Sequence, residues 1–189
     1  TIGGGRIIDP FSPARGRARP QRLALVKAMG EPEPSNALKK VLSLTSGGLD
    51  LNRFGQSRNL APSEAEVLWE SVDMVRLGGA RDAVGIERTA WEGLRDAIVE
   101  AVRAWHQARP DQPGPEEERL RRNLPRVTVP AVFSAALLDL LSEKRIARDG
   151  VYLTLPGHRA VFSDADTALA AAAGGRRHDR HHYWSRLAW

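Results

Sequence analysis

The sequence predicts a mainly α fold with small β wings, organised as tandem winged-helix modules, each a helix-turn-helix followed by a β-hairpin. Short amphipathic helices followed by two short strands occur twice along the 189 residues, and this order is the pattern of a winged helix. The length also suits two compact units better than one. We place the first module at residues 20–86 and the second at residues 87–157.

The first module begins where apolar residues return at helical spacing. A helix that starts near Arg22 has to end at the Gly30–Pro34 break, because proline lacks the amide proton that a continuing helix requires. Ser35 is the expected N-cap of a second helix that reaches Leu44. Two further helices, up to Asn59 and from Pro62, precede strands at 74–77 and 82–86.

The long helix predicted at 89–109 is the strongest element of the second module. Thr89 and Glu92 have the spacing of a capping box at its start. Apolar side chains recur along one stripe, formed by Trp91, Leu94, Ile98, Ala101, Val102 and Trp105. Because Trp91 and Trp105 belong to this stripe, we expect both rings to pack in the core rather than to stack on nucleic-acid bases.

Two helices and a hairpin complete the second module. Pro115 is the expected first residue of a helix that ends at Asn123, with glutamates in its first turn and arginines in its last. An apolar helix follows at 130–142. The pair Asp149-Gly150 predicts a type I′ turn between the two strands of the wing.

The two ends of the chain lie outside these modules. Residues 1–19 begin with three glycines and a short β-branched run around Ile7, which indicates the last strand of another unit, and continue as a linker rich in arginine and proline. After the second wing we predict a linker helix within residues 158–175. Residues 176–189 are expected to form a disordered basic tail.

Composition narrows the classes of function. No cysteine is present, which excludes disulfide frameworks and thiolate metal sites. No apolar run approaches the roughly 18 residues of a membrane span, and no secretory signal is recognisable, so we expect a cytoplasmic protein without membrane contact. The net charge of +5 lies at the ends: residues 1–22 carry +4, residues 174–189 carry +3, and the middle carries −2. Any basic face for nucleic acid is therefore expected to be a local cluster.

The sequence predicts that this chain is not an enzyme. It has neither a Ser/His/Asp set of recognisable spacing nor the G-x-x-x-x-G-K-[ST] motif of a nucleotide-binding loop. His178, His181 and His182 have side chains that suit transition metals. Glycines precede them and no carboxylate-rich shell surrounds them, which favours a disordered tail over a metal site. We therefore expect no catalytic residue, metal or cofactor in this chain.

Three separated motifs resemble those of bacterial selenocysteine-specific translation elongation factors. The Gly3–Pro10 run is similar to the close of that family's third barrel. The stretch Trp105–Pro115, continued by Glu118–Arg122, resembles the linker and second helix of its second winged helix. Leu153–Ser163 is similar to the exit strand of that module. The motifs occur in family order over roughly residues 1–170, so the chain resembles the first two winged helices of such a factor without its GTPase.

This resemblance implies a role in translation. The full-length factor would bind GTP and magnesium, deliver selenocysteinyl-tRNA to the ribosome at UGA codons, and recognise the selenocysteine-insertion hairpin of the mRNA. The segment in hand would be a monomeric winged-helix spacer between the GTPase body and the distal mRNA-binding modules. RNA or ribosome contact by this segment would be auxiliary.

Six basic residues are candidates for contact with RNA phosphates: Arg119, Arg121, Arg122, Arg126, Lys144 and Arg145. The competing interpretation is that these charges complement a helix dipole and solvate the surface. Two other functions remain open, a DNA-binding regulator and a protein-interaction scaffold. The helix at 130–142 has no outward Arg, Lys, Asn or Gln to read bases, which argues against the regulator.

Overall fold

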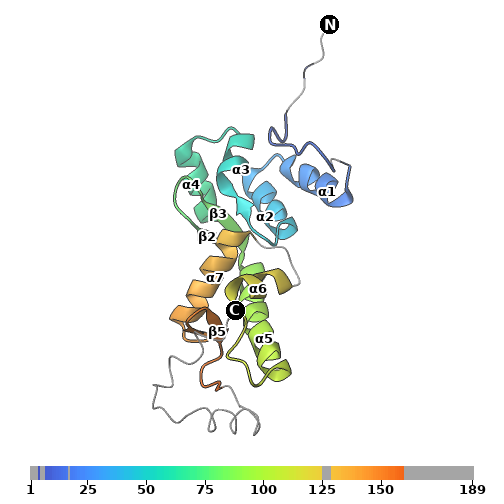
Figure 1. Ribbon diagram of the computed structural model, residues 1–189. Coiled ribbons are helices and arrows are strands. Elements are labelled where there is room, and N and C mark those ends of the chain that lie inside the picture. The colour runs from blue at the N-terminus through green and yellow to red at the C-terminus, as the bar shows by residue number, and fades with distance from the viewer. Residues whose placement is uncertain (1–3, 5–6, 17, 125–128, 160–189) are drawn as a thin grey trace, which may run out of the picture.

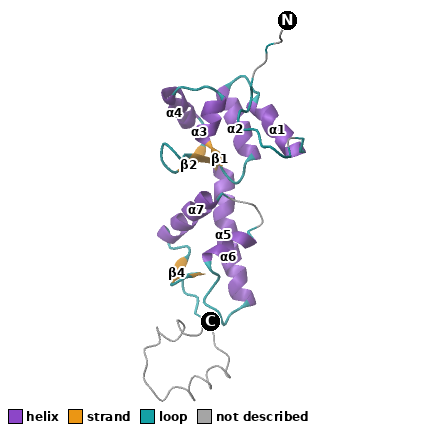
Figure 2. Ribbon diagram, turned by 45° about the horizontal axis from the view of Figure 1, so that its top comes forward, coloured by secondary structure: helices purple, strands orange, loops and turns teal. Residues whose placement is uncertain are grey.

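The structure, a computed structural model, describes residues 4, 7–16, 18–124 and 129–159. Two lobes are stacked end to end, an arrangement visible in both Figure 1 and Figure 2. The predicted fold class is confirmed, because helices dominate and the strands form two small antiparallel sheets. The helices are α1 (Pro20–Met29), α2 (Pro34–Leu44), α3 (Leu51–Ser57), α4 (Pro62–Ser71), α5 (Arg88–Ala108), α6 (Glu117–Asn123) and α7 (Pro130–Ser142). The strands are β1 (Leu49–Asp50), β2 (Met74–Leu77), β3 (Val84–Glu87), β4 (Ala147–Asp149) and β5 (Tyr152–Thr154).

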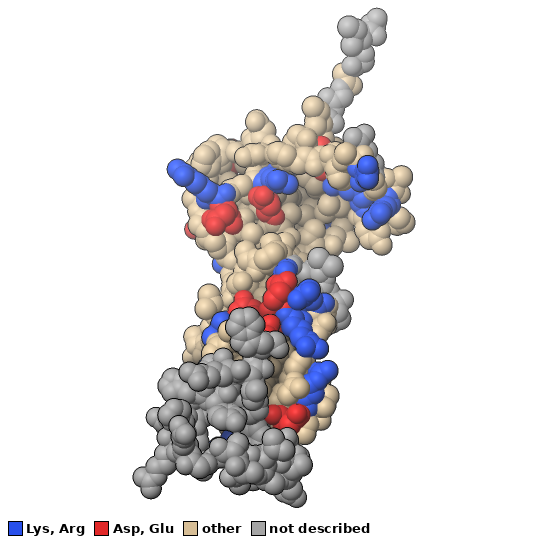
Figure 3. All heavy atoms as spheres, viewed as in Figure 1, with Lys and Arg blue, Asp and Glu red and all other residues tan. Residues whose placement is uncertain are grey.

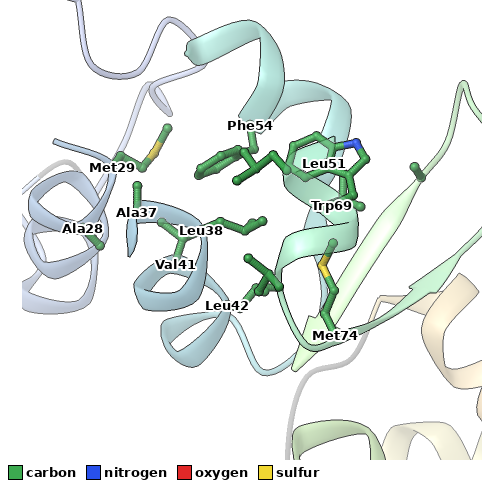
Figure 4. Packing of buried hydrophobic residues seen from close by; sticks show 13 residues of the cluster. Ala28, Met29, Ala37, Leu38, Val41, Leu42, Leu51, Phe54, Trp69 and Met74 are labelled. Atoms are coloured by element: carbon green, nitrogen blue, oxygen red, sulfur yellow. The ribbon is translucent and has the colours of Figure 1, made fainter. Parts of the chain in front are cut away.

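The core of the first lobe forms between α1, α2, α3 and α4 (Figure 4). The amphipathic face of α2 supplies Leu38, Val41 and Leu42, all at most 2% exposed. Phe54 and Trp69 meet edge to face with ring centroids 6.0 Å apart, a favourable geometry for aromatic pairs. These helices therefore bury a cluster of their own, independent of the second lobe.

The sheet of the first lobe has one face on each of the two cores. Its order is β1-β3-β2, and all neighbours are antiparallel. Side chains alternate between the faces of a strand, so Met74 packs into the first cluster while Val75 and Leu77 pack against the second. Their cross-strand partners Ile86 and Val84 share that second face. The first wing is thus buried between the lobes.

Two glycines allow the close approach that this joint requires. A Cβ atom on Gly85 would lie 2.8 Å from Leu51 Cδ2, inside the first core. Gly48 has φ +108°, and a Cβ there would lie 2.9 Å from a methyl group of Val132 on α7. The adjacent carbonyl of Gly47 accepts a hydrogen bond from the Val129 amide at 3.2 Å. The 47–48 turn of the first lobe therefore contacts the start of α7 directly.

The second lobe packs α5, α6 and α7 with the wing formed by β4 and β5. Trp91, Ile98 and Val102 of α5 are buried in its core, as the apolar stripe predicts. The wing is tied to the start of α6, because the Leu153 amide donates to the carbonyl of Pro115 at 2.9 Å and Tyr152 bridges Glu116. The buried cluster comprises Ile86, Trp91, Ile98, Val99, Val102, Leu120, Val132, Phe133, Ala136, Leu137, Leu140, Ile146 and Leu153.

Two predicted helix starts are wrong because of neighbouring residues. Pro34 occupies the first position of α2, where its fixed φ suits a helix, so Ser35 lies inside the helix and is not its N-cap. Pro115 does not begin α6, because its carbonyl is engaged by the wing; the helix begins at Glu117.

The predicted capping box and the predicted wing turn are also corrected. Thr89 lies inside α5, whose N-cap is Glu87. Glu92 accepts a hydrogen bond from Arg95 at 3.0 Å instead of capping the helix. In the second wing, Asp149 pairs with Tyr152, so the turn residues are Gly150 and Val151. Only Gly150 of these has a positive φ, of 60°, as in a type II′ turn rather than a type I′ turn.

The two ends of the chain are described only in part. Residues 4 and 7–16 contain no strand. Asp9 instead accepts a hydrogen bond from the Phe11 amide at 2.9 Å and forms an ion pair with Arg22 at the start of α1. The predicted helix that ends at Ala173 and the basic tail lie outside the described residues.

Candidate nucleic-acid interface

Three of the predicted RNA contacts lie on α6, whose charges follow its dipole. Glu117 and Glu118 occupy the first turn, and Arg121 and Arg122 the last. The Arg121 guanidinium donates to both oxygens of Glu118, at 2.9 and 3.1 Å. This hydrogen bond is the main cause that lowers the pKa of Glu118, and it raises the pKa of Arg121. Much of the charge at this end of α6 is therefore balanced within the helix.

Arg122 is bound more loosely to the same carboxylate. Its Nε lies 3.6 Å from Glu118 Oε1, and its side chain is 69% exposed. An exposed pair of this kind contributes little to stability and is screened by salt. Arg122 can thus exchange Glu118 for another anionic partner at a small cost in free energy.

Arg119 has a different environment from its neighbours on α6. Its guanidinium carbon lies 4.6 Å from the centroid of the Trp105 ring, and that of Arg109 lies 4.3 Å from the same centroid. Arg119 is exposed and Arg109 is half-buried. Among the described residues, neither arginine has a carboxylate within 4.0 Å, the limit for an ion pair. Two cations thus share one aromatic ring without an acidic partner.

The expectation for Trp105 is wrong, whereas that for Trp91 is confirmed. Trp91 is 6% exposed and belongs to the second core. Trp105 is only half-buried and lies outside that cluster, because its position near the end of α5 is beyond the reach of α7 and it is covered by arginine side chains instead. Its indole Nε1 is buried and has no hydrogen-bond acceptor among the described residues. The ring therefore serves as a platform at the edge of the lobe.

The other candidates lie away from this platform. Lys144 and Arg145 follow the end of α7, and Arg145 forms an ion pair with Asp96 at 3.0 Å. Asp96 and Trp105 are nine residues apart on α5, or about 13 Å along the helix axis. Arg126 lies outside the described residues. The structure therefore does not bring the six predicted residues into one cluster.

Figure 3 shows where the basic side chains gather on the second lobe. Lys and Arg follow one edge of the lobe, beside α6 and α5. Arg103, on α5, forms an ion pair with Glu100. Arg119 shares the Trp105 ring with Arg109 and lies on α6 with Arg121 and Arg122, so these arginines belong to one region of the surface.

Two buried polar residues of α5 were missed by the sequence reasoning. Arg95 is 7% exposed and forms ion pairs with Glu92, Asp139 and Glu143. Burial opposes its charged form, but the three carboxylates outweigh burial and hold the pKa of Arg95 above its ordinary value. Arg95 thereby joins α5 to α7. Its spacing, four residues after Trp91 and three before Ile98, was the available signal.

His106 is the second of these residues. Its ring stacks on that of His158, with centroids 3.5 Å apart and planes inclined by 6°. Each Nε2 lies beside a backbone carbonyl of the loop after α5, His106 at 3.1 Å from Pro113 and His158 at 3.2 Å from Gln112. Burial first, and then His158, lower the pKa of His106. The stack fastens the chain after the second wing to the end of α5.

The helix in the position of a DNA-reading helix offers few polar groups. Leu138 on the outer face of α7 is 65% exposed. Ala131 and Ser134, which precede it by seven and four residues on the same helix face, are exposed as well. Base readout in a groove requires hydrogen-bonding side chains at such positions. The outer face of α7 thus does not have the chemistry of a base-reading surface.

The described part of the chain contains no helix that is long and apolar enough to cross a membrane. Nor do its His, Asp and Glu residues include a group of three or more arranged to hold a metal ion. His178, His181 and His182 lie outside the residues that the structure describes.

Comparison with known proteins agrees with this architecture. Residues 99–155 match the family described as "Elongation factor SelB, winged helix". The chain is also similar to the selenocysteine-specific elongation factor of Escherichia coli (strain K12), with 25% identity over 173 residues. That match covers 89% of this chain and 27% of the relative, so the chain spans about a quarter of the relative's length. The matched family domain is a winged helix, so residues 99–155 resemble a winged helix of selenocysteine-specific elongation factors, and the chain as a whole is similar to a part of one such factor.

Proposed function

We propose that this segment is a rigid spacer within a selenocysteine-specific elongation factor. It would hold the part that delivers selenocysteinyl-tRNA at a fixed distance from the modules that recognise the insertion hairpin of the mRNA. The observation that carries this proposal is the sheet with a core on each face: Val75, Leu77 and Val84 pack on the second lobe, while Met74 packs on the first. Bending at this joint would expose the second cluster and the face of the sheet that packs on it to water, which the hydrophobic effect opposes.

The placement of the chain ends supports the same function. Residues 7–16 lie against the first lobe on the side away from the second lobe (Figure 1). At the opposite end, His158 is fastened to the loop after α5. The 21 residues of α5 alone extend the second lobe by about 30 Å. Whatever precedes and follows this segment would therefore be held well apart.

We further propose that the segment makes an auxiliary contact with RNA or the ribosome and binds neither GTP nor magnesium itself. The support is the row of basic side chains along α6 and α5 (Figure 3). Such contacts position a protein on a polyanion without reading its sequence. GTP and magnesium would be bound by the remainder of the factor.

A protein-interaction scaffold is the second candidate function. It is favoured by the exposed apolar side chains at Leu138 on α7 and Val151 at the tip of the second wing, which are 65% and 62% exposed. Exposed apolar side chains can take part in contacts with other proteins when they belong to a larger apolar surface. The spacer remains the better supported function, because it accounts for the buried first wing.

Insertion of a short Gly/Ser linker between Glu87 and Arg88, in a full-length factor that contains this segment, tests the spacer. The insertion separates β3 from α5 and changes no residue of either cluster, so the helices of each lobe should still fold while the fixed connection between the lobes is lost. UGA decoding dependent on the insertion hairpin should then fall sharply.

The matched control carries the same linker in the exposed turn between Gly79 and Arg81. This insertion lengthens the wing and leaves the joint intact. Equal decoding by the two insertion variants would reject the spacer, as would decoding by the joint variant at the level of the unmodified factor.

A further inference from the structure

We propose that Arg109 and Arg119, held over the ring of Trp105, form a contact site for the phosphate backbone of RNA. This inference rests on the auxiliary RNA contact proposed above and names the residues that make it. Arg109 and Trp105 were not among the six predicted contact residues. Arg119 was, and it differs from the other candidates in its surroundings.

The first argument is the availability of the two charges. Arg121, Arg122 and Arg145 each have a carboxylate within ion-pair distance. Among the described residues, Arg109 and Arg119 have none, and their contact is the Trp105 ring. An aromatic face attracts a cation but supplies no acceptor comparable to a carboxylate oxygen. Within the described part of the chain, the N–H donors of both guanidinium groups are therefore available to bind phosphate oxygens.

The second argument is preorganisation. An exposed arginine normally loses rotamer freedom when it binds, which opposes association. Here the ring restricts both side chains before any ligand arrives, and the half-buried Trp105 is itself fixed by α5. Part of the ordering cost is thus met in the free protein. Arginine rather than lysine suits this site, because its planar fork both lies against rings and pairs with phosphate through two donors.

The third argument is spacing. The two guanidinium carbons lie 4.3 and 4.6 Å from one ring centroid, so they are no more than about 9 Å apart, the sum of those distances. Phosphates along a nucleic-acid strand are close enough for such a pair to contact neighbouring groups. A regular phosphodiester backbone therefore fits the pair better than the irregular charges of an acidic protein surface. Within the body of the chain, which carries a net charge of −2, this pair is a local concentration of positive charge.

The experiment measures binding of the whole chain to a short single-stranded oligouridylate between about 50 and 200 mM salt. The double variant Arg109→Gln/Arg119→Gln should bind about tenfold more weakly at low salt, because two charge-assisted contacts are lost. The slope of log K against log salt should decrease in magnitude by about 1.4, the value for two phosphate contacts on a single strand.

Two further variants separate charge from geometry. Arg53→Gln/Arg76→Gln removes the same charge from the first lobe, where both arginines already have carboxylate partners, and should bind like the unmodified chain. Arg109→Lys/Arg119→Lys keeps the charge and should restore the salt slope while recovering only part of the affinity. Because the lysine variant retains both positive charges, recovery of the salt slope also shows that the weaker binding of the glutamine variant is not caused by misfolding.

The proposal is overturned if the Arg109/Arg119 and Arg53/Arg76 glutamine variants bind alike, if the unmodified chain does not bind the oligouridylate, or if it binds polyglutamate more tightly than RNA. The last result would assign the platform to an acidic protein. None of these results bears on the spacer, which the linker insertions test separately.

Discussion

His106 shows how one residue couples the end of the second lobe to pH. The ring is buried against His158 and its Nε2 donates a hydrogen bond to the Pro113 carbonyl, so a second proton on His106 has to be accommodated beside another imidazole. Burial and His158 hold the pKa of His106 below 6.5, its ordinary value in an unfolded chain. The folded state therefore favours the neutral ring.

The sign of the pH effect follows from this difference. The stabilisation is fully present above pH 6.5 and is lost as the pH falls from 6.5 towards the lowered pKa of the folded state, because the unfolded chain binds the proton more readily. Urea denaturation across this window should show that the free energy of unfolding decreases as the pH is lowered. Asp and Glu titrate at lower pH and contribute little there.

His106→Gln provides the comparison for this prediction, since the amide still reaches the Pro113 carbonyl but does not titrate. The pH dependence of the variant should be weaker than that of the unmodified chain, with all other histidines in common. An identical slope in both proteins, or stability that rises as the pH falls, would contradict the account.

Residue-scale sequence patterns located some of these groups and missed others for identifiable reasons. The apolar stripe of α5 extends by four residues from Val102 to His106, so the burial of His106 was within reach of the pattern. The contact of Trp105 with its two arginines was not within reach of the pattern. Trp105 and Arg109 are one helical turn apart, but Arg119 reaches the ring only because the 109–116 loop reverses the chain. Spacing along the sequence carries no information about that reversal.

At the scale of elements, β3 is the strand on which the joint depends. Gly85 has no side chain because Leu51 and the sulfur of Met74 occupy the space, at 2.8 and 2.9 Å from an added Cβ. Gly85→Ala should lower the free energy of unfolding by about 1–3 kcal/mol through overpacking. Chemical denaturation of the chain measures this change.

Gly93 on α5 is the matched control, since an added Cβ meets nothing within 4 Å there. Gly93→Ala should stabilise the chain by up to about 1 kcal/mol, because alanine favours a helix interior more than glycine does. If the two substitutions had the same effect, the close packing inferred at β3 would be wrong.

The bodies of the elements were predictable because hydrophobic periodicity survives in the fold. Their starts were not, since local rules compete there. Helix α2 begins at Pro34, so Ser35 is not its N-cap. The Pro115 carbonyl accepts a hydrogen bond from Leu153 of the second wing, and α6 begins two residues later. The two strands of the first wing were predicted, and Val75, Leu77, Val84 and Ile86 form its apolar face toward the second lobe. Which helices would cover the second face required the three-dimensional structure.

At the scale of the whole molecule, the account rests on a fixed relation between the lobes. The first wing lies between two cores, and Gly47 and Gly48 contact the start of α7 beside it. A spacer built in this way transmits position through packing rather than through a flexible linker. Sequence alone placed two modules in order but gave no orientation between them.

The distance between the lobes, measured by pulsed electron spin resonance, tests this relation most directly. The chain has no cysteine, so Lys39→Cys on α2 and Gln107→Cys on α5, both at exposed positions, accept one spin label each. The account predicts one narrow distance distribution for the labelled chain and a broad one when the linker is inserted between Glu87 and Arg88. A broad or two-peaked distribution without the insertion would contradict the rigid spacer.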